Sequence, residues 1–206
     1  GWWDFGTGAL GDIACHSMAP VFFALDLKYP TAIEAEKSAP FSDCFPSWSI
    51  IRYEFPARRS MPPVKLTWYD GGKMPPRPDE LEPERNLADN GTILIGDKGK
   101  MLLSGYAPRI IPEVKMQDFK RPPESLPRIP AGDHHNDWFI ACKGGRPACS
   151  NFDFAGPLAE SVLAGNIALR LGKRLEWDGP NMRFANSNEA NQLINPPSRN
   201  GWELKS

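Results

Sequence analysis

The sequence predicts an α+β fold: one open, mostly antiparallel β-sheet with helices packed on one face. The order of the patterns along the chain carries this prediction. A helical pattern opens the chain, several short alternating segments follow it, and two helical patterns come near the end. Helices and strands that are segregated along the chain in this way are typical of α+β proteins. The 206 residues suffice for one substantial core, so we expect residues 1–206 to form a single domain.

The first helix is expected from Ala9 to about Leu25, because apolar residues recur there at steps of three and four. Pro20 lies inside this pattern and should kink or divide the helix. Strands are expected where apolar and polar residues alternate, at residues 32–38, 48–55 and 64–69. The alternation predicts a sheet with one buried face and one polar face.

The second half of the chain predicts a hairpin, a loop and two helices. Residues 92–95 and 100–103 flank the turn Gly96-Asp97-Lys98-Gly99, and 109–111 adds a last strand. The proline-rich residues 112–130 are expected to be a surface loop. Further elements follow in order: a helix from about His134 to Gly144-Gly145, the strongest helix at 153–171, a short strand at 175–178 and an Asn- and Pro-rich tail.

Composition excludes several classes of partner. The net charge is −1, with 24 basic and 25 acidic residues spread evenly, so no nucleic-acid partner is expected. No apolar run approaches the roughly 18 to 20 residues that span a bilayer, so no membrane span is expected. The 4 cysteines are scattered without a CxxC pair, which predicts free, partly buried thiols.

The stretch Gly6-Thr7-Gly8-Ala9-Leu10-Gly11 spells G-x-G-x-x-G, the dinucleotide-binding fingerprint. A working fingerprint follows a buried strand, whereas only Gly1 to Phe5 precede this one and Asp4 interrupts them. An antiparallel pattern follows, where a Rossmann unit would continue strand, helix, strand. We therefore interpret the glycines as small residues that let the start of a helix pack closely.

Asp12 and His16 are the candidate catalytic pair. They are four residues apart and therefore lie on one face of the first helix, about 6 Å from each other. A carboxylate at that position can hold an imidazole, favour its charged form and keep one ring nitrogen pointing outward, as a general base requires. A simple surface pair is the alternative.

Three blocks of the sequence are similar to one known family. WWDFGTGALGDIACH, GDHHNDWFIACKGG and FAGPLAESVLAGNIALRLGKRLEWD resemble, in this order, the C-terminal domain of the glucose-fructose oxidoreductase / inositol dehydrogenase (Gfo/Idh/MocA) family. The resemblance implies a dihydrodipicolinate reductase-like domain on a large antiparallel sheet, which commonly mediates homo-oligomer formation. It also implies an N-terminal Rossmann domain that binds NAD or NADP. Because this chain opens on Gly1-Trp2-Trp3, we expect that an upstream portion is missing, and localisation (cytoplasmic or exported) is left open.

The resemblance also implies a reaction. The family's D-x-x-x-H motif falls on Asp12 and His16, so His16 would take the proton from a sugar, glycoside or polyol hydroxyl while hydride leaves the same carbon for the nicotinamide. Asp12 would orient His16. The family's E-K-P loop belongs to the Rossmann domain and is absent here. We therefore expect no dinucleotide bound to this chain and no turnover by it alone.

The resemblance suggests further substrate contacts. Trp3 could stack on a pyranose face or pack in the core, and Asp4 and Thr7 could bind sugar hydroxyls or cap the helix. His134 and His135 open a helix and could contact a ligand there.

No metal is expected, because a three-His site with His16 would need His134 and His135 to converge. Adjacent residues are expected to point apart.

Two other functions stay open from the sequence. Some relatives hold NAD tightly, oxidise a glycoside transiently and eliminate its substituent, and so act as glycoside hydrolases. Alternatively the chain is a binding or assembly module with a degenerate site, in which sheet residues such as Trp48, Ile50 and Trp68 matter more than His16.

Overall fold

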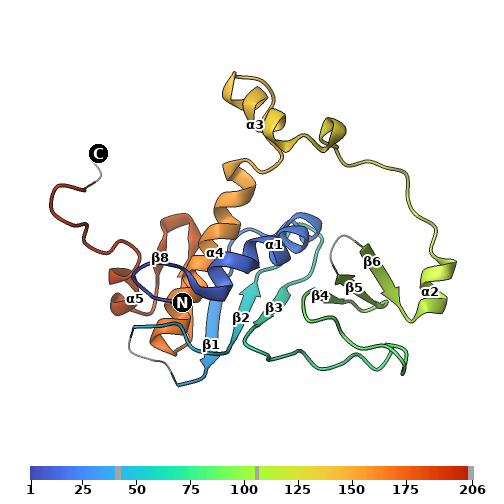
Figure 1. The fold of residues 1–206 in the computed structure, drawn as a ribbon, viewed down its shortest axis with the longest axis horizontal. Coiled ribbons are helices and arrows are strands. Elements are labelled where there is room, and N and C mark those ends of the chain that lie inside the picture. The colour runs from blue at the N-terminus through green and yellow to red at the C-terminus, as the bar shows by residue number, and fades with distance from the viewer. Residues whose placement is uncertain (40–42, 105–106, 204–206) are drawn as a thin grey trace. The chain divides into compact units, whose positions relative to one another are not determined.

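The computed structural model describes residues 1–39, 43–104 and 107–203 (Figure 1). The chain divides into two compact units: unit 1 comprises Gly1–Met74 with Phe152–Ser206, and unit 2 comprises Pro75–Asn151. Each unit has its own sheet, so the predicted single sheet is corrected to two. The organisation of residues 1–206 as one domain stays a prediction.

Unit 1 is built on a five-stranded sheet in the order β3-β2-β1-β7-β8, and its neighbouring strands pair antiparallel. The predicted antiparallel α+β class is thereby confirmed. The strands are β1 (Ala32–Lys37), β2 (Ser49–Phe55), β3 (Val64–Tyr69), β7 (Leu175–Asp178) and β8 (Arg183–Phe184). The two-residue β8 and the short helix α5 (Asn188–Gln192) lie in the segment that the sequence predicted as tail.

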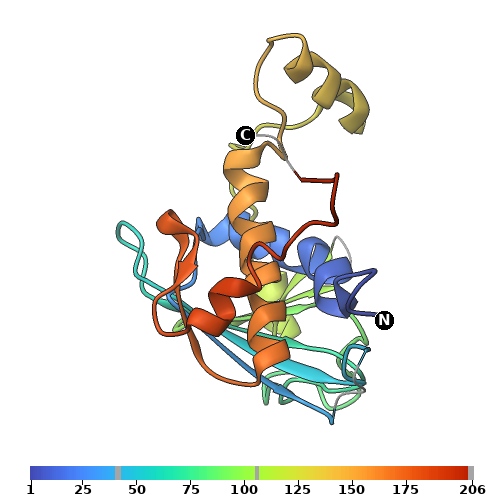
Figure 2. The ribbon, with the colours of Figure 1, turned by 90° about the vertical axis from the view of Figure 1, so that its left-hand side faces the viewer.

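Two long helices lie side by side on one face of this sheet, α1 (Gly8–Leu25) and α4 (Phe152–Leu171) (Figure 2). They run antiparallel, because the rings of Phe23, near the end of α1, and Phe154, near the start of α4, are 6.0 Å apart. Pro20 does not divide α1, which continues through it as one helix.

The core of unit 1 follows the alternation of its strands. Ile51, Tyr53 and Phe55 of β2 are buried against the helices, and the ring of Phe55 meets that of Phe22 edge-on. On the opposite face, Arg52 pairs with Glu36 at 2.6 Å. The predicted division into a buried face and a polar face is therefore confirmed for β2.

Helix α4 approaches β2 at a glycine. A β-carbon on Gly165 would lie 2.0 Å from the hydroxyl oxygen of Tyr53, so only glycine allows this separation. The Tyr53 hydroxyl is buried and has no hydrogen-bond partner within the described residues. Burial raises its pKa far above the ordinary value, so it stays protonated.

Unit 2 contains a three-stranded antiparallel sheet in the order β4-β5-β6. Its elements are β4 (Thr92–Ile95), β5 (Lys100–Ser104), β6 (Ala107–Ile111), α2 (Glu113–Asp118) and α3 (His134–Cys142). Helix α2 falls in the predicted loop. It begins after Pro112 and has Glu113 in its first turn, where a carboxylate is favoured by the helix dipole.

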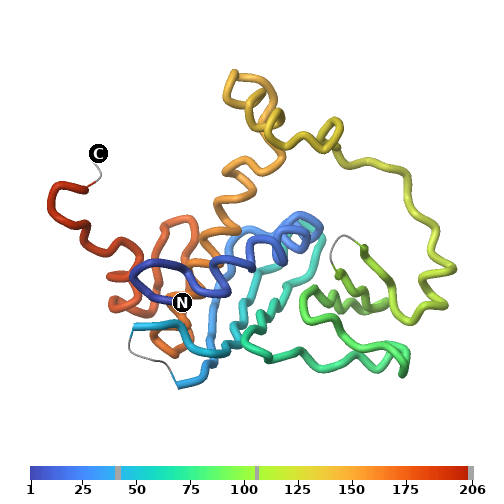
Figure 3. Tube along the Cα trace, in the orientation of Figure 1, coloured from blue at the N-terminus to red at the C-terminus, as the bar shows by residue number. Residues whose placement is uncertain are grey.

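The segment before β4 contains no strand and can be followed in Figure 3. The carboxylate of Glu82 in this segment contacts residues at the β6 edge of the sheet. Glu82 accepts hydrogen bonds from Arg109 Nη2 at 2.5 Å and from the backbone N–H of Glu113 at 2.6 Å. Arg109 also donates to Glu113 Oε2 at 2.7 Å. The Arg109 guanidinium is the main cause that lowers the pKa of Glu82 to about 2.

Helix α1 is a weak candidate for a membrane span, and no strong candidate occurs among the described residues. Its 18 residues are long and apolar enough, by composition, to cross a membrane. This is weak evidence, because the core helix of a folded domain passes the same test, and Leu10, Ala14 and Phe22 of α1 are buried in the core of unit 1.

Substitution of Gly165 by alanine should destabilise unit 1. The added methyl group must displace Tyr53 or α4, and overpacking of this kind costs about 1–3 kcal/mol. Gly156→Ala is the matched control in the same helix, because no atom lies within 4 Å of its β-carbon position. That control should raise the free energy of unfolding by about 0.5–1 kcal/mol. Urea unfolding of the two variants measures both effects, and equal changes would contradict the close approach.

Acid should weaken unit 2 through Glu82. Its folded pKa, about 2, lies below the ordinary 4.5, so the ionised carboxylate stabilises the fold above pH 4.5. This stabilisation is lost as the pH falls from about 4.5 to about 2. In Arg109→Gln the pKa of Glu82 should rise toward its ordinary value, as followed by carboxyl NMR shifts against pH. Lys98→Gln removes the same charge from an exposed turn and should leave the Glu82 titration unchanged.

Candidate functional site

Asp12 and His16 are both exposed on helix α1, one turn apart. Neither side chain has a hydrogen-bond or ion-pair partner among residues 1–39, 43–104 and 107–203. The carboxylate–imidazole contact that the spacing predicts is therefore not formed in this structure. Both groups are free to meet a ligand or another protein surface.

Thr7 occupies the N-cap position of α1, but its side chain makes no capping hydrogen bond. Its carbonyl oxygen instead accepts two hydrogen bonds, from the backbone N–H of Gly11 at 3.0 Å and from Asn166 Nδ2 of α4 at 2.7 Å. A β-carbon on Gly11 would lie 2.0 Å from Thr7 Oγ1, so the threonine side chain covers that glycine. The start of α1 is thus fixed by α4 rather than by a capping side chain.

Two glycines of the fingerprint, Gly8 and Gly11, are covered by neighbouring side chains. Gly8 has φ +64°, and a β-carbon there would lie 2.5 Å from the ring of Phe45. The residues before the helix form one isolated β-bridge, Trp2 with Cys44, and no strand. A dinucleotide loop needs a preceding buried strand and an open backbone beneath the pyrophosphate. The residues present therefore do not fit the NAD(P) pyrophosphate at this position.

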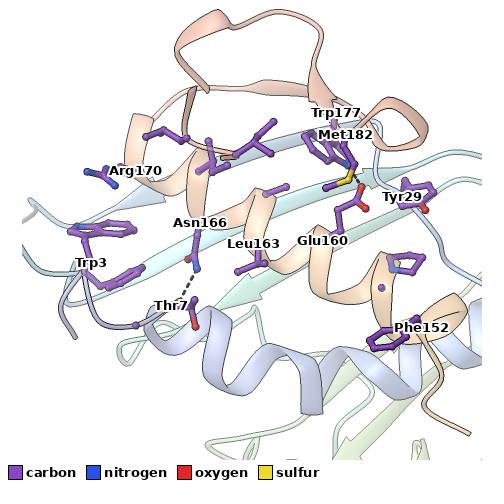
Figure 4. Close-up of a pocket in the computed structure, with 18 residues that line it drawn as sticks. Trp3, Thr7, Tyr29, Phe152, Glu160, Leu163, Asn166, Arg170, Trp177 and Met182 are labelled. Atoms are coloured by element: carbon purple, nitrogen blue, oxygen red, sulfur yellow. Dashed lines mark hydrogen bonds between the residues drawn. The ribbon is translucent and has the colours of Figure 1, made fainter. Parts of the chain in front are cut away.

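A cavity of about 630 Å³ lies along the outer side of α4 (Figure 4). We call it the α4 cavity. Its size is in the range of small-molecule sites. Neither Asp12 nor His16 lines it, whereas the predicted substrate residues Trp3 and Thr7 do. The lining residues are Trp3, Gly6, Thr7, Tyr29, Phe45, Phe152, Gly156, Pro157, Glu160, Leu163, Ala164, Asn166, Ile167, Arg170, Trp177, Met182, Leu193 and Ile194.

Trp3 is held between two neighbours at one end of the α4 cavity. Its ring centroid lies 3.6 Å from that of Phe45, at an interplanar angle of 32°. The guanidinium of Arg170 lies 5.4 Å from the Trp3 centroid, within the range of a cation–π contact. The indole therefore belongs to an aromatic and cationic stack at the rim of the cavity.

Two polar side chains of α4 face the α4 cavity from its inner wall. Glu160 accepts a hydrogen bond from Trp177 Nε1 at 2.8 Å, and burial is the main cause that raises the pKa of Glu160. Asn166 is 8% exposed, and its Oδ1 has no partner within the described part of the chain. The sequence motifs did not indicate Glu160, Asn166 or Arg170 as site residues. These residues could have been recognised as polar positions within the otherwise apolar pattern of the predicted helix at 153–171.

The remaining predicted contacts lie elsewhere. Asp4 is exposed, next to Trp3 in unit 1. His134 and His135 begin α3 in unit 2, and their ring centroids are 4.1 Å apart. The expectation that adjacent histidines point apart is wrong here, because the first turn of α3, capped by Asp133, lets the rings pack on each other. Within the described residues no group of three His, Cys, Asp or Glu side chains could hold a metal.

The buried carboxylate of Asp137 in α3 binds two residues of the loop that follows this helix. Asp137 accepts a hydrogen bond from the backbone N–H of Cys149 at 2.8 Å and pairs with Arg146 at 2.5 Å. The Cys149 hydrogen bond is the largest of the causes that lower the pKa of Asp137. Cys142 and Cys149 are free and exposed, so the predicted free thiols are confirmed, but these two are not buried.

These features define an α+β protein with an exposed Asp/His pair on its first helix. A model of an oxidoreductase family, for its C-terminal alpha/beta domain (Gfo/Idh/MocA), matches residues 85–204. The chain therefore belongs to the Gfo/Idh/MocA oxidoreductase family, as the resemblance indicated. The matched residues include α3 and α4 and begin after α1. A search of curated proteins finds no match to the chain.

The chain by itself should not bind a dinucleotide. Because Phe45 and Thr7 fill the space over Gly8 and Gly11, an NADH titration followed by nucleotide fluorescence should show no saturable binding into the millimolar range. A protein with an intact Rossmann domain serves as the positive control. Saturable binding that Gly8→Ala removes would contradict the packing role of these glycines.

Proposed function

We propose that this chain is the substrate-side domain of an NAD(P)-dependent oxidoreductase that acts on a sugar, glycoside or polyol hydroxyl. Membership of the Gfo/Idh/MocA oxidoreductase family supports the reaction class. The observation that carries the proposal is the exposed pair on α1, Asp12 and His16, one turn apart and without a partner among the described residues.

In the proposal this chain performs the proton transfer. A neutral imidazole at His16 accepts the hydroxyl proton of the substrate, and the carboxylate of Asp12 stabilises the imidazolium that forms. Their exposure supports these roles, because a general base must come within hydrogen-bond reach of the proton that it removes. NAD or NADP accepts the hydride and is held by a separate N-terminal domain, since the glycines at the start of α1 do not fit it.

The proposal includes assembly of copies through the sheet face that α1 and α4 leave uncovered. This face carries Arg52, Glu54 and Arg174, whose side chains are 41%, 43% and 47% exposed. Arg174, the residue before β7, pairs with Glu54 of β2 at 2.9 Å, across the intervening strand β1. The charges would favour a polar contact that weakens with salt rather than an apolar dimer core.

His16→Ala should lower turnover about 10²–10⁴-fold in a protein that joins this chain to its dinucleotide-binding domain, because a general base contributes about that much. Asp12→Asn should lower it less, since His16 remains. Ala24→Ser, an exposed change about two turns further along α1, is the control that should keep full activity. NADH formation with a sugar or polyol panel is the measurement.

Ordinary turnover in His16→Ala would refute the assignment of the base. Glycoside cleavage without net NADH would instead indicate transient oxidation and elimination. Absence of both activities, with oligomers still seen in light scattering, would indicate an assembly module.

A further inference from the structure

The α4 cavity lies on the side of α4 that faces away from the sheet. Its wall is a stripe of residues at steps of three and four, so they share one face of the helix, whereas Val162 and Leu169 are buried in the core. The stripe consists of Gly156, Glu160, Leu163, Ile167 and Arg170. Between its polar ends the wall is apolar, so an occupant must have an apolar middle part.

Asn166 provides an acceptor that lacks a donor. Its Nδ2 donates a hydrogen bond to the Thr7 carbonyl oxygen at 2.7 Å, and this bond fixes the orientation of the side chain. Its Oδ1 is buried and unpartnered within the described residues. A buried acceptor without a hydrogen bond is unfavourable, and the residue lines the α4 cavity, so a hydroxyl or N–H of a bound molecule would satisfy it. Asn166 also lines a smaller cavity of about 110 Å³, which has room for water.

Arg170 provides a cation one turn further along the same helix, about 6 Å from Asn166 between β-carbons. Its side chain is exposed and has no carboxylate partner in the described part of the chain. The Trp3 ring, backed by Phe45, holds the guanidinium at the rim of the α4 cavity (Figure 4). A planar fork of N–H donors in a fixed place matches a carboxylate.

The other end of the α4 cavity disfavours an anion. Glu160 lies ten residues before Arg170, about 15 Å along the helix axis. Its carboxyl group is half-buried and accepts the indole N–H of Trp177. A second carboxylate beside it would meet a like charge. The charges of the wall therefore orient an acidic ligand with its carboxylate at Arg170.

We propose that the α4 cavity binds an aromatic hydroxy acid. Its carboxylate pairs with Arg170, its hydroxyl donates to Asn166 Oδ1, and its ring packs on Leu163 and Ile167. A benzene ring substituted at opposite ends supplies the apolar middle part and keeps the carboxylate and the hydroxyl apart, as separate partners at Arg170 and Asn166 require. The site does not use Asp12 or His16, so it does not depend on the proposed oxidoreductase activity.

The test is NMR titration of the ¹⁵N-labelled chain with para-hydroxybenzoate, benzoate and phenol. Para-hydroxybenzoate should shift the Trp3 indole N–H and the Asn166 side-chain amide saturably. Arg170→Gln should weaken the binding of para-hydroxybenzoate and of benzoate at least about tenfold. It should leave the affinity for phenol unchanged, since only the two acids have a carboxylate that pairs with the guanidinium. Arg199→Gln is the matched control, because Arg199 also lies over a tryptophan, 5.0 Å from the Trp202 centroid, and neither residue lines the cavity.

Three results would overturn the proposal. The first is no shift of the Trp3 and Asn166 signals up to the solubility limit of para-hydroxybenzoate. The second is equal weakening by Arg170→Gln and Arg199→Gln. The third is binding of benzoate as tight as that of para-hydroxybenzoate, which would show that water from the smaller cavity already satisfies Asn166.

Discussion

The close approach of α4 to the five-stranded sheet is the constraint on which the rest of unit 1 depends. It exists because Gly165 has no side chain where the buried hydroxyl of Tyr53 lies. The next residue, Asn166, is thereby brought within reach of the Thr7 carbonyl at the start of α1. One glycine thus sets the separation of helix and sheet, and the adjacent amide sets where the helix that carries Asp12 and His16 begins.

The same arrangement gives α4 two faces with different roles. Its inner face packs on β1 and β2, and its outer stripe lines the α4 cavity. Trp3 and Thr7, which lie beside the candidate catalytic helix in sequence, line this cavity, whereas Asp12 and His16 on α1 do not. The chain therefore presents two chemically distinct surfaces: an exposed Asp/His pair, for which we propose proton transfer, and an apolar cavity with one acceptor and one cation.

Local patterns predicted the elements well where a single physical cause acts. Alternation in 48–55 and 64–69 predicted β2 and β3 to within one residue, and the apolar stripe of 153–171 predicted α4 to within one residue. Predictions failed where distant packing decided. Helix α1 is not divided at Pro20, the chain forms two sheets, and the rings of His134 and His135 lie together. None of these outcomes follows from a local pattern alone, because each depends on which partner surface is available.

The sequence by itself determined the antiparallel α+β class, the family and the position of Asp12 and His16 on one helix face, because periodicity and short motifs are properties of neighbouring residues. Only the tertiary structure decided that the glycine fingerprint is a packing site, since Phe45 lies 37 residues from Gly8 along the chain. It also decided that Asn166, 159 residues from Thr7, fixes the start of α1. Contacts over such separations depend on how the chain folds back, and no local signal in the sequence encodes them.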